Sequence, residues 1–409
     1  MINFLRKAIT VSLSFLMIFP LSSFAETAHY HDKYAKYVIV SDMDTGRILY
    51  QKNPDTKSAM ASMSKIMTLA VTLDALKSKK VSLNDVVTIQ NSDVNREGSN
   101  IKLSAGEKIT LDQLLHGLMI VSGNDAALAI ARYIGKTENN FVNMMNVKAR
   151  EIGMKNTIFY NPNGLPQKTP NGTVENTTTA RDVLTLTKWM YKNYPHEVIR
   201  ITDSAKYVDK SRGIDEANTN PLLPLIPSVD GLKTGFTPKA GYCLAFSMSV
   251  PKGNGNSLNN RFFGVTMGSP DKNARKLSAY DTINFINNNY KTIVPYTAGS
   301  KVTTAPINNY TPLMTDMIVH KDVVAVKRNT EKLKPSFVYS KISIGDVSKK
   351  PIGKMVLKNS SGVVVSRADI YADKISELPI TAKLRLWLSA IHQTITNGKT
   401  DGSFPIITI

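Results

Sequence analysis

Ser62 and Lys65 are the two residues of this sequence whose types and spacing most directly predict chemistry. Apolar residues follow at helical intervals, at Ile66, Leu69 and Leu73, so both polar side chains should lie on one face of a first helical turn. A serine hydroxyl attacks a substrate only with the help of a base, and a lysine is such a base when burial or a nearby cation lowers its pKa. The pair alone is not specific, because an ordinary polar helix start would contain the same two residues.

Two later segments contain residues that could complete such a site. Ser122 and Asn124 stand between two predicted helices, where a hydroxyl can relay a proton and an amide can hold a substrate peptide. Further on, the Lys-Thr-Gly segment at 233–235 runs into a predicted strand at 241–250. A glycine there lets a substrate backbone approach as an added strand, while the lysine charge and the threonine hydroxyl suit a carboxylate. Neither segment is specific on its own.

In this order the three segments match the signature of the penicillin-binding and β-lactamase superfamily. The chain resembles the low-molecular-mass D-alanyl-D-alanine carboxypeptidases, which are penicillin-binding serine peptidases of bacterial peptidoglycan. The resemblance covers about residues 35–290 and includes the segments at 44–46, 153–157, 179–182 and 229–235. It implies an α+β fold, in which an antiparallel sheet flanked by helices and a helical cluster form a penicillin-binding/β-lactamase-like domain.

The resemblance also implies a role for each catalytic residue. Ser62 corresponds to the acylated nucleophile, Lys65 to the base that activates it, and Ser122 to the group that passes a proton toward the leaving group. The backbone N–H groups of Ser62 and Phe236 would form the oxyanion hole. The scissile bond would join the last two D-alanines of the stem peptide, and water would then hydrolyse the acyl-enzyme.

The substrate-binding residues are implied by the same resemblance. Asn124 would bind the peptide amide, and Lys233 would set the electrostatics around the second serine. Thr234 would meet the terminal carboxylate of the substrate, beside Gly235 and Phe236. These five residues, with the catalytic three, make up the predicted site.

The sequence departs from the family pattern at three positions. Ala61 stands where a proline is common before the nucleophile, which should be harmless because either residue can precede a helix. Phe236 replaces a frequent histidine, which leaves the use of its N–H intact but should change side-chain preference. Thr219 stands where some relatives have an arginine, so one contact with the substrate carboxylate is in doubt. Arg275 matches no substrate-binding arginine and is assigned no role.

Four other functions are compatible with the same motifs. A class A β-lactamase also needs a Glu-x-x-Leu-Asn segment that activates the deacylating water, and no such segment lies between Asn124 and Lys233. We therefore expect penicillin to acylate Ser62 and to stay there. A DD-endopeptidase or a transpeptidase would use the same site with another substrate or acceptor, and a non-catalytic wall-binding or β-lactam-sensing protein would keep only the fold. A β domain after the catalytic one favours the carboxypeptidase.

The composition, with 42% hydrophobic and 20% charged residues among 409, is typical of a folded protein with room for two domains. Residues 1–25 are predicted to be a removable secretory signal, because Arg6 and Lys7 precede an apolar run that ends in small residues at 23 and 25. An exported chain with a formal net charge of +19 and scattered lysines suits an anionic wall polymer or lipid surface better than nucleic acid. Cys243 is alone and the six histidines are scattered, so we expect no disulfide, no metal and no cofactor.

The predicted organisation is a signal peptide at 1–25, a catalytic domain at 30–293, a small β-rich domain at 300–379, an amphipathic helix at 380–397 and a tail at 398–409. The catalytic domain should contain helices at 62–77, 111–119, 124–134, 139–152, 180–193 and 272–289, and strands at 37–40, 48–50, 241–250 and 261–267, the last two flanking a hairpin at 252–260.

The helix at 380–397 has Leu384, Trp387 and Leu388 on one face and basic residues mostly opposite. Such a helix can lie in a membrane interface, although a helix that docks on its own domain has the same pattern. We therefore expect an exported enzyme on the periplasmic side of the bacterial cytoplasmic membrane, in peripheral contact with the membrane surface through this helix. Its expected partners are peptidoglycan stems that end in D-Ala-D-Ala and β-lactams as covalent inhibitors.

Overall fold

A computed structural model describes residues 30–94, 97–249, 261–306, 314–340, 342 and 350–373, together with 381, 384, 385, 388 and 392. The predicted signal peptide, the hairpin at 252–260 and the tail at 398–409 lie outside the described residues. Of the predicted helix at 380–397 only the five single positions are described, and these are helical. The chain divides into two units, Met1–His31 and Asp32–Ile409, and all that follows concerns the second. Within the described residues, no helix combines the length and the apolar character needed to cross a bilayer.

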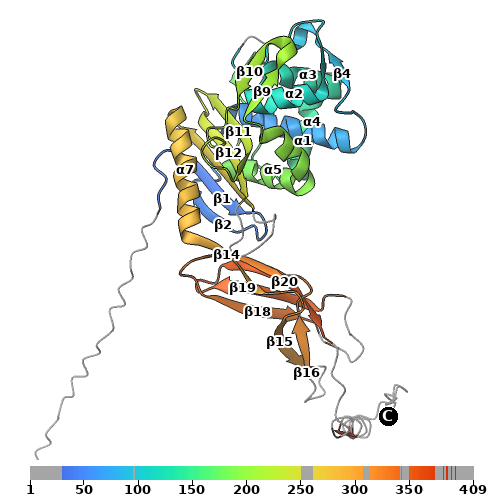
Figure 1. Ribbon diagram of the computed structural model, residues 1–409, viewed down its shortest axis with the longest axis vertical. Helices are drawn as coiled ribbons and strands as arrows, with labels where there is room; N and C mark the ends of the chain where they lie inside the picture. Colours follow the sequence, from blue (N-terminus) through green and yellow to red (C-terminus); the bar gives the residue numbers. More distant parts are fainter. Residues whose placement is uncertain are drawn as a thin grey trace, which may run out of the picture. The chain divides into compact units, whose positions relative to one another are not determined.

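A five-stranded antiparallel sheet is the framework of the catalytic domain (Figure 1). Its strands in spatial order are β11 (Val229–Thr237), β12 (Gly241–Ser249), β13 (Arg261–Ser269), β1 (Tyr37–Asp42) and β2 (Ile48–Lys52). The side chains of neighbouring residues in one strand pack in different cores, because successive side chains point to opposite faces of the sheet. Ala245 packs in the core that contains helix α5 (Ala180–Asn193), and Phe246 in the core that contains α7 (Lys272–Asn289). The sheet is therefore buried on both faces, and β11 and β2 are its edges.

Helices on the α5 side of the sheet form the larger core (Figure 1). They are α1 (Ser64–Lys77), α2 (Leu111–His116), the π-helical turn η3 (Gly117–Val121), α3 (Asn124–Gly135), α4 (Glu138–Glu151) and α6 (Pro195–Thr202). Every residue of α1 from Ser64 to Leu73 is buried, so this helix is the centre of the cluster. Thr110 caps α2 as predicted, since its Oγ1 accepts a hydrogen bond from the Gln113 N–H at 3.2 Å. The predicted helix at 111–119 is wrong at its end, because the α-helix gives way to η3 after His116.

Short elements complete the catalytic domain. The strands are β3 (Ser58–Ala59), β4 (Val86–Thr88), β5 (Lys108–Thr110), β6 (Gln167–Thr169), β7 (Gly172–Val174), β8 (Thr177–Thr178), β9 (Lys206–Asp209) and β10 (Ile214–Ala217). The 3-10 turns are η1 (Ala61–Met63), η2 (Asn91–Asp93) and η4 (Lys210–Arg212). Of these, η1, β3 and β8 lie next to the site described below.

A separate β domain follows α7, as predicted. β14 (Tyr290–Tyr296) leads into it and pairs with β17 (Val323–Arg328). A second antiparallel sheet has the order β15 (Lys301–Pro306), β16 (Met314–Ile318), β20 (Val364–Ala372), β19 (Gly353–Asn359) and β18 (Leu333–Tyr339). Met317, Met355 and Ile370 are fully buried in a core of its own. The predicted limits of the two domains, 30–293 and 300–379, stay predictions.

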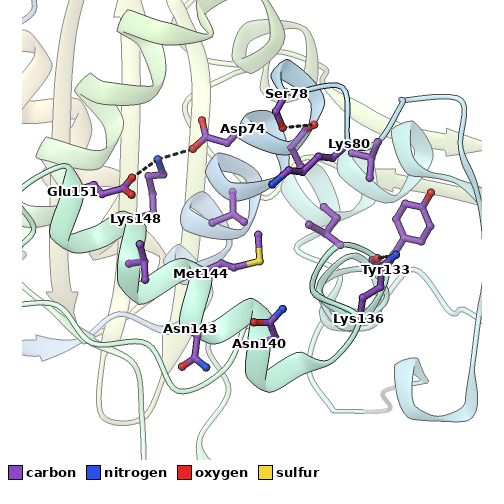
Figure 2. A pocket seen from close by; sticks show the side chains of 15 residues that line it. Asp74, Ser78, Lys80, Tyr133, Lys136, Asn140, Asn143, Met144, Lys148 and Glu151 are labelled. Carbon is purple, nitrogen blue, oxygen red and sulfur yellow. Dashed lines mark hydrogen bonds and ion pairs between the residues drawn. The ribbon is translucent and has the colours of Figure 1, made fainter.

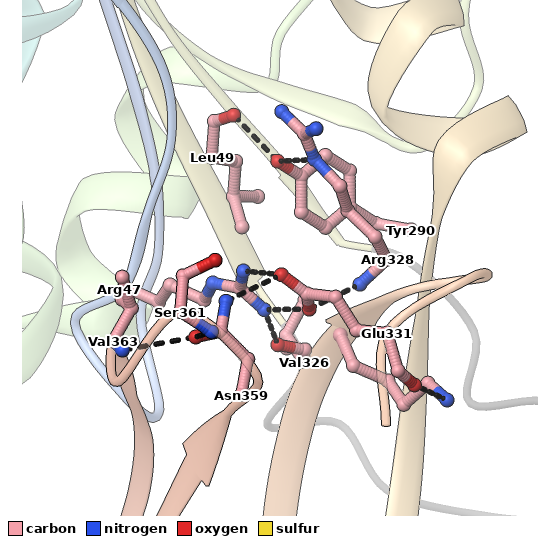
Figure 3. Close-up of polar contacts among 10 residues, drawn as sticks. Arg47, Leu49, Tyr290, Val326, Arg328, Glu331, Asn359, Ser361 and Val363 are labelled. Carbon is pink, nitrogen blue, oxygen red and sulfur yellow. Dashed lines mark hydrogen bonds and ion pairs between the residues drawn. The ribbon is translucent and has the colours of Figure 1, made fainter. Parts of the chain in front are cut away.

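A buried ion pair joins the two domains (Figure 3). Arg47, in the turn between β1 and β2, donates to Glu331 through Nη1 at 2.8 Å and through Nη2 at 2.5 Å. The same Nη1 donates to the Val326 carbonyl at 2.7 Å. Glu331 also accepts hydrogen bonds from Asn359 Nδ2 and from the Arg328 N–H, each at 2.9 Å. The Arg47 side chain is only 6% exposed, so solvent screens this pair much less than an ordinary surface pair.

This ion pair makes part of the stability of the fold depend on pH. Burial alone would raise the pKa of Glu331, but the hydrogen bonds from Arg47, Asn359 and the Arg328 N–H, with the Arg47 charge, lower it to about 2. A glutamate in an unfolded chain has a pKa of about 4.3. Above about pH 5 the carboxylate is ionised in both the folded and the unfolded chain, so the pair then contributes its full stabilisation. We expect Glu331→Gln to lower the free energy of unfolding by about 1–2 kcal/mol at pH 7, and the deficit to shrink as the pH falls toward 2.

Urea unfolding of wild type and Glu331→Gln at pH 7 and pH 3 would test this expectation. Glu216→Gln is a matched control, because the Glu216 side chain is 48% exposed and its Lys102 partner lies 4.0 Å away. Such exposed pairs contribute little, so the control should unfold like wild type at both pH values. A Glu331→Gln deficit of equal size at pH 7 and pH 3 would contradict the role of the ion pair.

Candidate active site

The structure brings Ser62 and Lys65 together, as their spacing predicts. Ser62 is the middle residue of the 3-10 turn η1, and Lys65 is the second residue of α1. Lys65 Nζ lies 3.0 Å from Ser62 Oγ, 2.6 Å from Asn124 Oδ1 and 2.8 Å from the Asn163 carbonyl oxygen. A neutral amine has two N–H groups and one lone pair. With its N–H groups directed at the two asparagines, the amine keeps its lone pair for the Ser62 hydroxyl proton.

The surroundings of Lys65 favour the neutral amine. Its side chain is fully buried, and burial lowers its pKa well below the ordinary value. The charge of Lys233 lowers the pKa further, while the charge of Asp125 opposes both effects. Desolvation penalises the ammonium form, so the lysine is available as a base at neutral pH.

The turn that carries Ser62 is held in an unusual conformation. Ala61 has a φ of +47°, a left-handed conformation that residues with a side chain rarely adopt. The loop at 161–166 packs against it so closely that a Cβ on Gly164 would lie 2.0 Å from the Ala61 carbonyl oxygen. Because the α-helix starts only at Ser64, the predicted helix start at 62 is wrong by two residues. The loop thus fixes both the turn before the serine and, through the Asn163 carbonyl, the lysine.

Ser122 and Asn124 flank the junction between η3 and α3. Ser122 ends the π-helical turn with a φ of +70° and is 5% exposed. Asn124 contacts the amine of Lys65, and its Nδ2 donates to the Glu97 carbonyl at 2.8 Å. This amide therefore orients the lysine, and its predicted contact with a substrate amide stays a prediction. Among the described residues, Ser122 Oγ makes no hydrogen bond to Lys65 or Lys233, so its role as proton relay also stays a prediction.

The Lys-Thr-Gly segment lies on β11, the edge strand, directly beside the serine. A Cβ on Gly235 would lie 3.1 Å from the Ser62 nitrogen and equally close to the Met60 carbonyl oxygen, so a side chain there would push the nucleophile turn away by a few tenths of an ångström. Thr234 is nearly buried, and the neighbouring Phe236 is 49% exposed, with its ring stacked on Tyr242 at 4.1 Å between centroids. The free edge of β11 therefore faces the side on which an extended peptide could add as another strand.

Two positively charged side chains lie near this strand, Lys233 on β11 itself and Arg275 on α7. Lys233 is buried and donates from Nζ to the Thr234 carbonyl at 2.9 Å. Burial lowers its pKa to about 7, and the charge of Arg275 contributes to the shift. Arg275 lies on α7 with its guanidinium 5.8 Å from the centre of the Tyr242 ring, and its buried Nε has no hydrogen-bond partner in the described part of the chain. Sequence reasoning left Arg275 out because no motif surrounds it; only the packing of α7 on the sheet brings it here.

No carboxylate is among the hydrogen-bond partners of Lys65 in the described residues. Glu175, on the loop before α5, is buried, and its Oε2 accepts a hydrogen bond from Thr237 Oγ1 at 2.7 Å. In the β-lactamase alternative, a loop glutamate activates water for deacylation. Glu175 contacts the end of β11 and not the lysine, so its placement gives no support to that alternative.

A hollow of about 580 Å³ lies between α1, α3 and α4 (Figure 2). None of the predicted site residues lines it. Its most ordered polar feature is Lys148, which donates to Asp74 of α1 and Glu151 of α4, each at 2.6 Å. This lysine connects two helices of the core, and the hollow is separate from the serine site.

The chain is similar to known proteins of one family. The D-alanyl-D-alanine carboxypeptidase family (Peptidase_S11) matches residues 24–270. The D-alanyl-D-alanine carboxypeptidase DacF of Bacillus subtilis is 31% identical over 354 residues, which cover 85% of each chain. A D-alanyl-D-alanine endopeptidase of Pseudomonas aeruginosa is 33% identical over 217 residues, covering 52% of this chain and 66% of that protein. The crystal structure of penicillin binding protein 5 from Haemophilus influenzae superposes with a TM-score of 0.69 at 27% identity, covering 84% of this chain and 97% of that one.

Proposed function

Because the chain belongs to the D-alanyl-D-alanine carboxypeptidase family of serine hydrolases, we propose that it removes the terminal D-alanine of peptidoglycan stem peptides through an acyl-enzyme on Ser62. The observation that carries this proposal is the Lys65 amine, buried with a lowered pKa and 3.0 Å from the Ser62 hydroxyl. A purified enzyme should release D-alanine from a pentapeptide that ends in D-Ala-D-Ala. Failure to release it would refute the proposal.

We propose the following course for acylation and deacylation. The lone pair of Lys65 takes the Ser62 proton while Oγ attacks the carbonyl carbon between the two D-alanines. The Ser62 and Phe236 N–H groups stabilise the oxyanion. The tetrahedral intermediate collapses when the proton on Lys65 passes, through Ser122, to the nitrogen of the departing D-alanine. Water then attacks the ester, with Lys65 again as the base, and frees the serine and the shortened peptide.

Substrate binding uses the edge of β11. The peptide adds to this strand, and the absence of a side chain on Gly235 lets its backbone come close to Ser62. The terminal carboxylate lies at Thr234, where the positive charges of Lys233 and Arg275 attract it. The amide of Asn124 contacts the peptide on the opposite side of the cleft. Arg275 contributes charge to this region through its effect on Lys233, whereas Thr219 replaces an arginine of some relatives.

Penicillin distinguishes this enzyme from a β-lactamase. Penicillin should acylate Ser62 in the same way as the peptide and remain attached, because the described partners of Lys65 include no glutamate to activate water. Mass spectrometry of the purified protein after incubation with penicillin would locate the adduct. Rapid turnover of penicillin would favour the β-lactamase instead.

Endopeptidase activity is a second candidate, and the Pseudomonas aeruginosa relative is the observation that favours it. The same acyl-enzyme forms when the leaving group is the amine of a neighbouring stem peptide instead of D-alanine. Incubation with a purified cross-linked muropeptide dimer separates the two activities, since only an endopeptidase converts the dimer to monomers. A transpeptidase would instead transfer the acyl group to an added amine acceptor.

We propose that the enzyme is exported through the signal at 1–25 and attaches to the periplasmic face of the cytoplasmic membrane through the helix at 380–397. Support comes from Leu384 and Leu388, one helical turn apart, which are 55% and 52% exposed. Deletion of residues 383–409 should move the protein from the membrane fraction to the soluble fraction without lowering D-alanine release. Unchanged membrane fractionation of the deletion variant would refute attachment by this helix.

A further inference from the structure

A buried glutamate lies at the end of the substrate strand, outside the residues assigned to the reaction. Glu175 follows β7 and is 7% exposed. Its Oε2 accepts the hydrogen bond from Thr237, and among the described residues Oε1 has no hydrogen-bond partner and no cation pairs with the carboxylate. Glu175 Oε1 is not among the fully buried side-chain atoms that lack a hydrogen-bond partner, so this oxygen remains open to solvent and to a ligand. A cationic group of a ligand would therefore be a favourable partner.

Glu175 lies on the Ser62 side of the strand. Gly235 and Thr237 are two residues apart in β11, so their Cβ directions point to the same face. On that face, the Cβ direction of Gly235 meets the Ser62 nitrogen at 3.1 Å, and Thr237 meets Glu175. Thr237 directly follows Phe236, whose N–H takes the oxyanion in the proposed function, so it lies about 3.4 Å of strand, or one residue of an added peptide, beyond the reacting carbonyl. The chain next to Glu175 is also fixed to the nucleophile turn, since the Met60 N–H donates to the Asn176 carbonyl at 3.1 Å.

The direction of the bound peptide decides which of its residues meets Glu175, and this step rests on the proposed function. With the terminal carboxylate at Thr234 and the scissile carbonyl at the Phe236 N–H, the peptide runs antiparallel to β11 and its penultimate D-alanine pairs with Phe236. The residue before the two D-alanines then lies along Thr237. In peptidoglycan stems that residue is a diamino acid, lysine or diaminopimelate, whose side-chain amine is protonated at neutral pH.

We propose that Glu175 is a specificity-determining residue, which binds the side-chain ammonium of the diamino acid before D-Ala-D-Ala. Thr237 is the positioning residue that holds its carboxylate. An ion pair formed in this nearly buried place is stronger than a surface pair, because water screens it less. The enzyme therefore favours stems whose diamino acid still has a free amine over stems in which that amine is already in a cross-link.

The test compares two tripeptides that differ only in this charge, Nα-acetyl-L-Lys-D-Ala-D-Ala and its Nα,Nε-diacetyl form. Wild type should have a kcat/KM about 10-fold higher for the free amine. In Glu175→Gln, which keeps the shape and removes the charge, the ratio should fall to about one. A third peptide with diaminopimelate in place of lysine shows which diamino acid Glu175 prefers, and either preference supports the proposal provided that Glu175→Gln abolishes it.

Glu197→Gln is the matched control, because it removes one negative charge from an exposed position in the first turn of α6 and should keep the wild-type ratio. Thr237→Val should lower the ratio partly, since the carboxylate loses the hydroxyl that holds it. A wild type with equal kcat/KM on all three peptides, or a ratio unchanged in Glu175→Gln, would overturn the proposal. Absence of D-alanine release from every peptide would instead refute the proposed function, so the two failures are distinguishable.

Discussion

Ser62→Ala should release D-alanine from a pentapeptide roughly 10⁴- to 10⁶-fold more slowly than wild type, the range seen when a serine hydrolase loses its nucleophile. Without Oγ no acyl-enzyme forms, and only the oxyanion N–H groups and substrate binding remain. The same variant should form no covalent penicillin adduct. D-Alanine release measured by coupled oxidation, with intact-mass analysis of the penicillin reaction, reports both effects.

Ser78→Ala is the control for this variant, because Ser78 lies at the exposed C-terminal end of the same helix. It should keep wild-type activity and the penicillin adduct. Equal D-alanine release by wild type and Ser62→Ala would remove Ser62 from the mechanism. An adduct mapped to any other residue of the wild type would do the same.

Lys65→Arg should lower kcat/KM by roughly 10²- to 10⁴-fold, the usual contribution of a general base. The guanidinium is protonated at every relevant pH and has no free lone pair, so it cannot take the proton of Ser62. Burial and the charge of Lys233 lower the pKa of Lys65 well below its ordinary value, which favours the neutral amine that the base requires. Loss of the base slows acylation by penicillin as much as acylation by the peptide.

Stopped-flow measurement of penicillin acylation separates this effect from substrate binding. Lys77→Arg, in the last turn of the same helix and exposed, is the matched control and should acylate at the wild-type rate. If Lys65→Arg acylates as fast as wild type, then Lys65 is not the base. The variant should also unfold at about the wild-type temperature if the loss is chemical and not structural, which a melting curve would check.

The sequence predicted the contact of Ser62 with Lys65 because both residues lie within one turn of chain, where local geometry decides. The residues that complete the surroundings of the lysine were harder to predict. Asn163 contributes a backbone carbonyl, which every residue has, so its type carries no signal. Arg275 and Glu175 reach the site through the packing of α7 and of the loop before α5, and no local pattern marks either one.

In the fold, too, the elements set by local sequence pattern were predicted and those set by distant contacts were not. Alternating and helical patterns predicted the main strands and helices, because burial of one face determines them. The 3-10 turn at Ser62 and the π-helical turn before Ser122 were not predicted. Both turns depend on residues far away in the sequence. For the turn at Ser62, this is shown by the close packing of Gly164 against the Ala61 carbonyl. They occur where the backbone must turn a serine toward the cleft, so local preference failed at the candidate site itself.

The order of the central sheet separates the substrate from the second domain. Arg47, which holds Glu331, leads into β2, whereas the peptide strand adds to β11 at the opposite edge. Four strand spacings of about 4.8 Å put about 19 Å between these two edges. In the membrane-attached enzyme proposed above, a pull on the second domain would reach the sheet through the ion pair at β2 and through the covalent chain from β14 and α7 to β13. Neither path ends on β11, so at least one strand would lie between the applied force and the edge that takes the peptide.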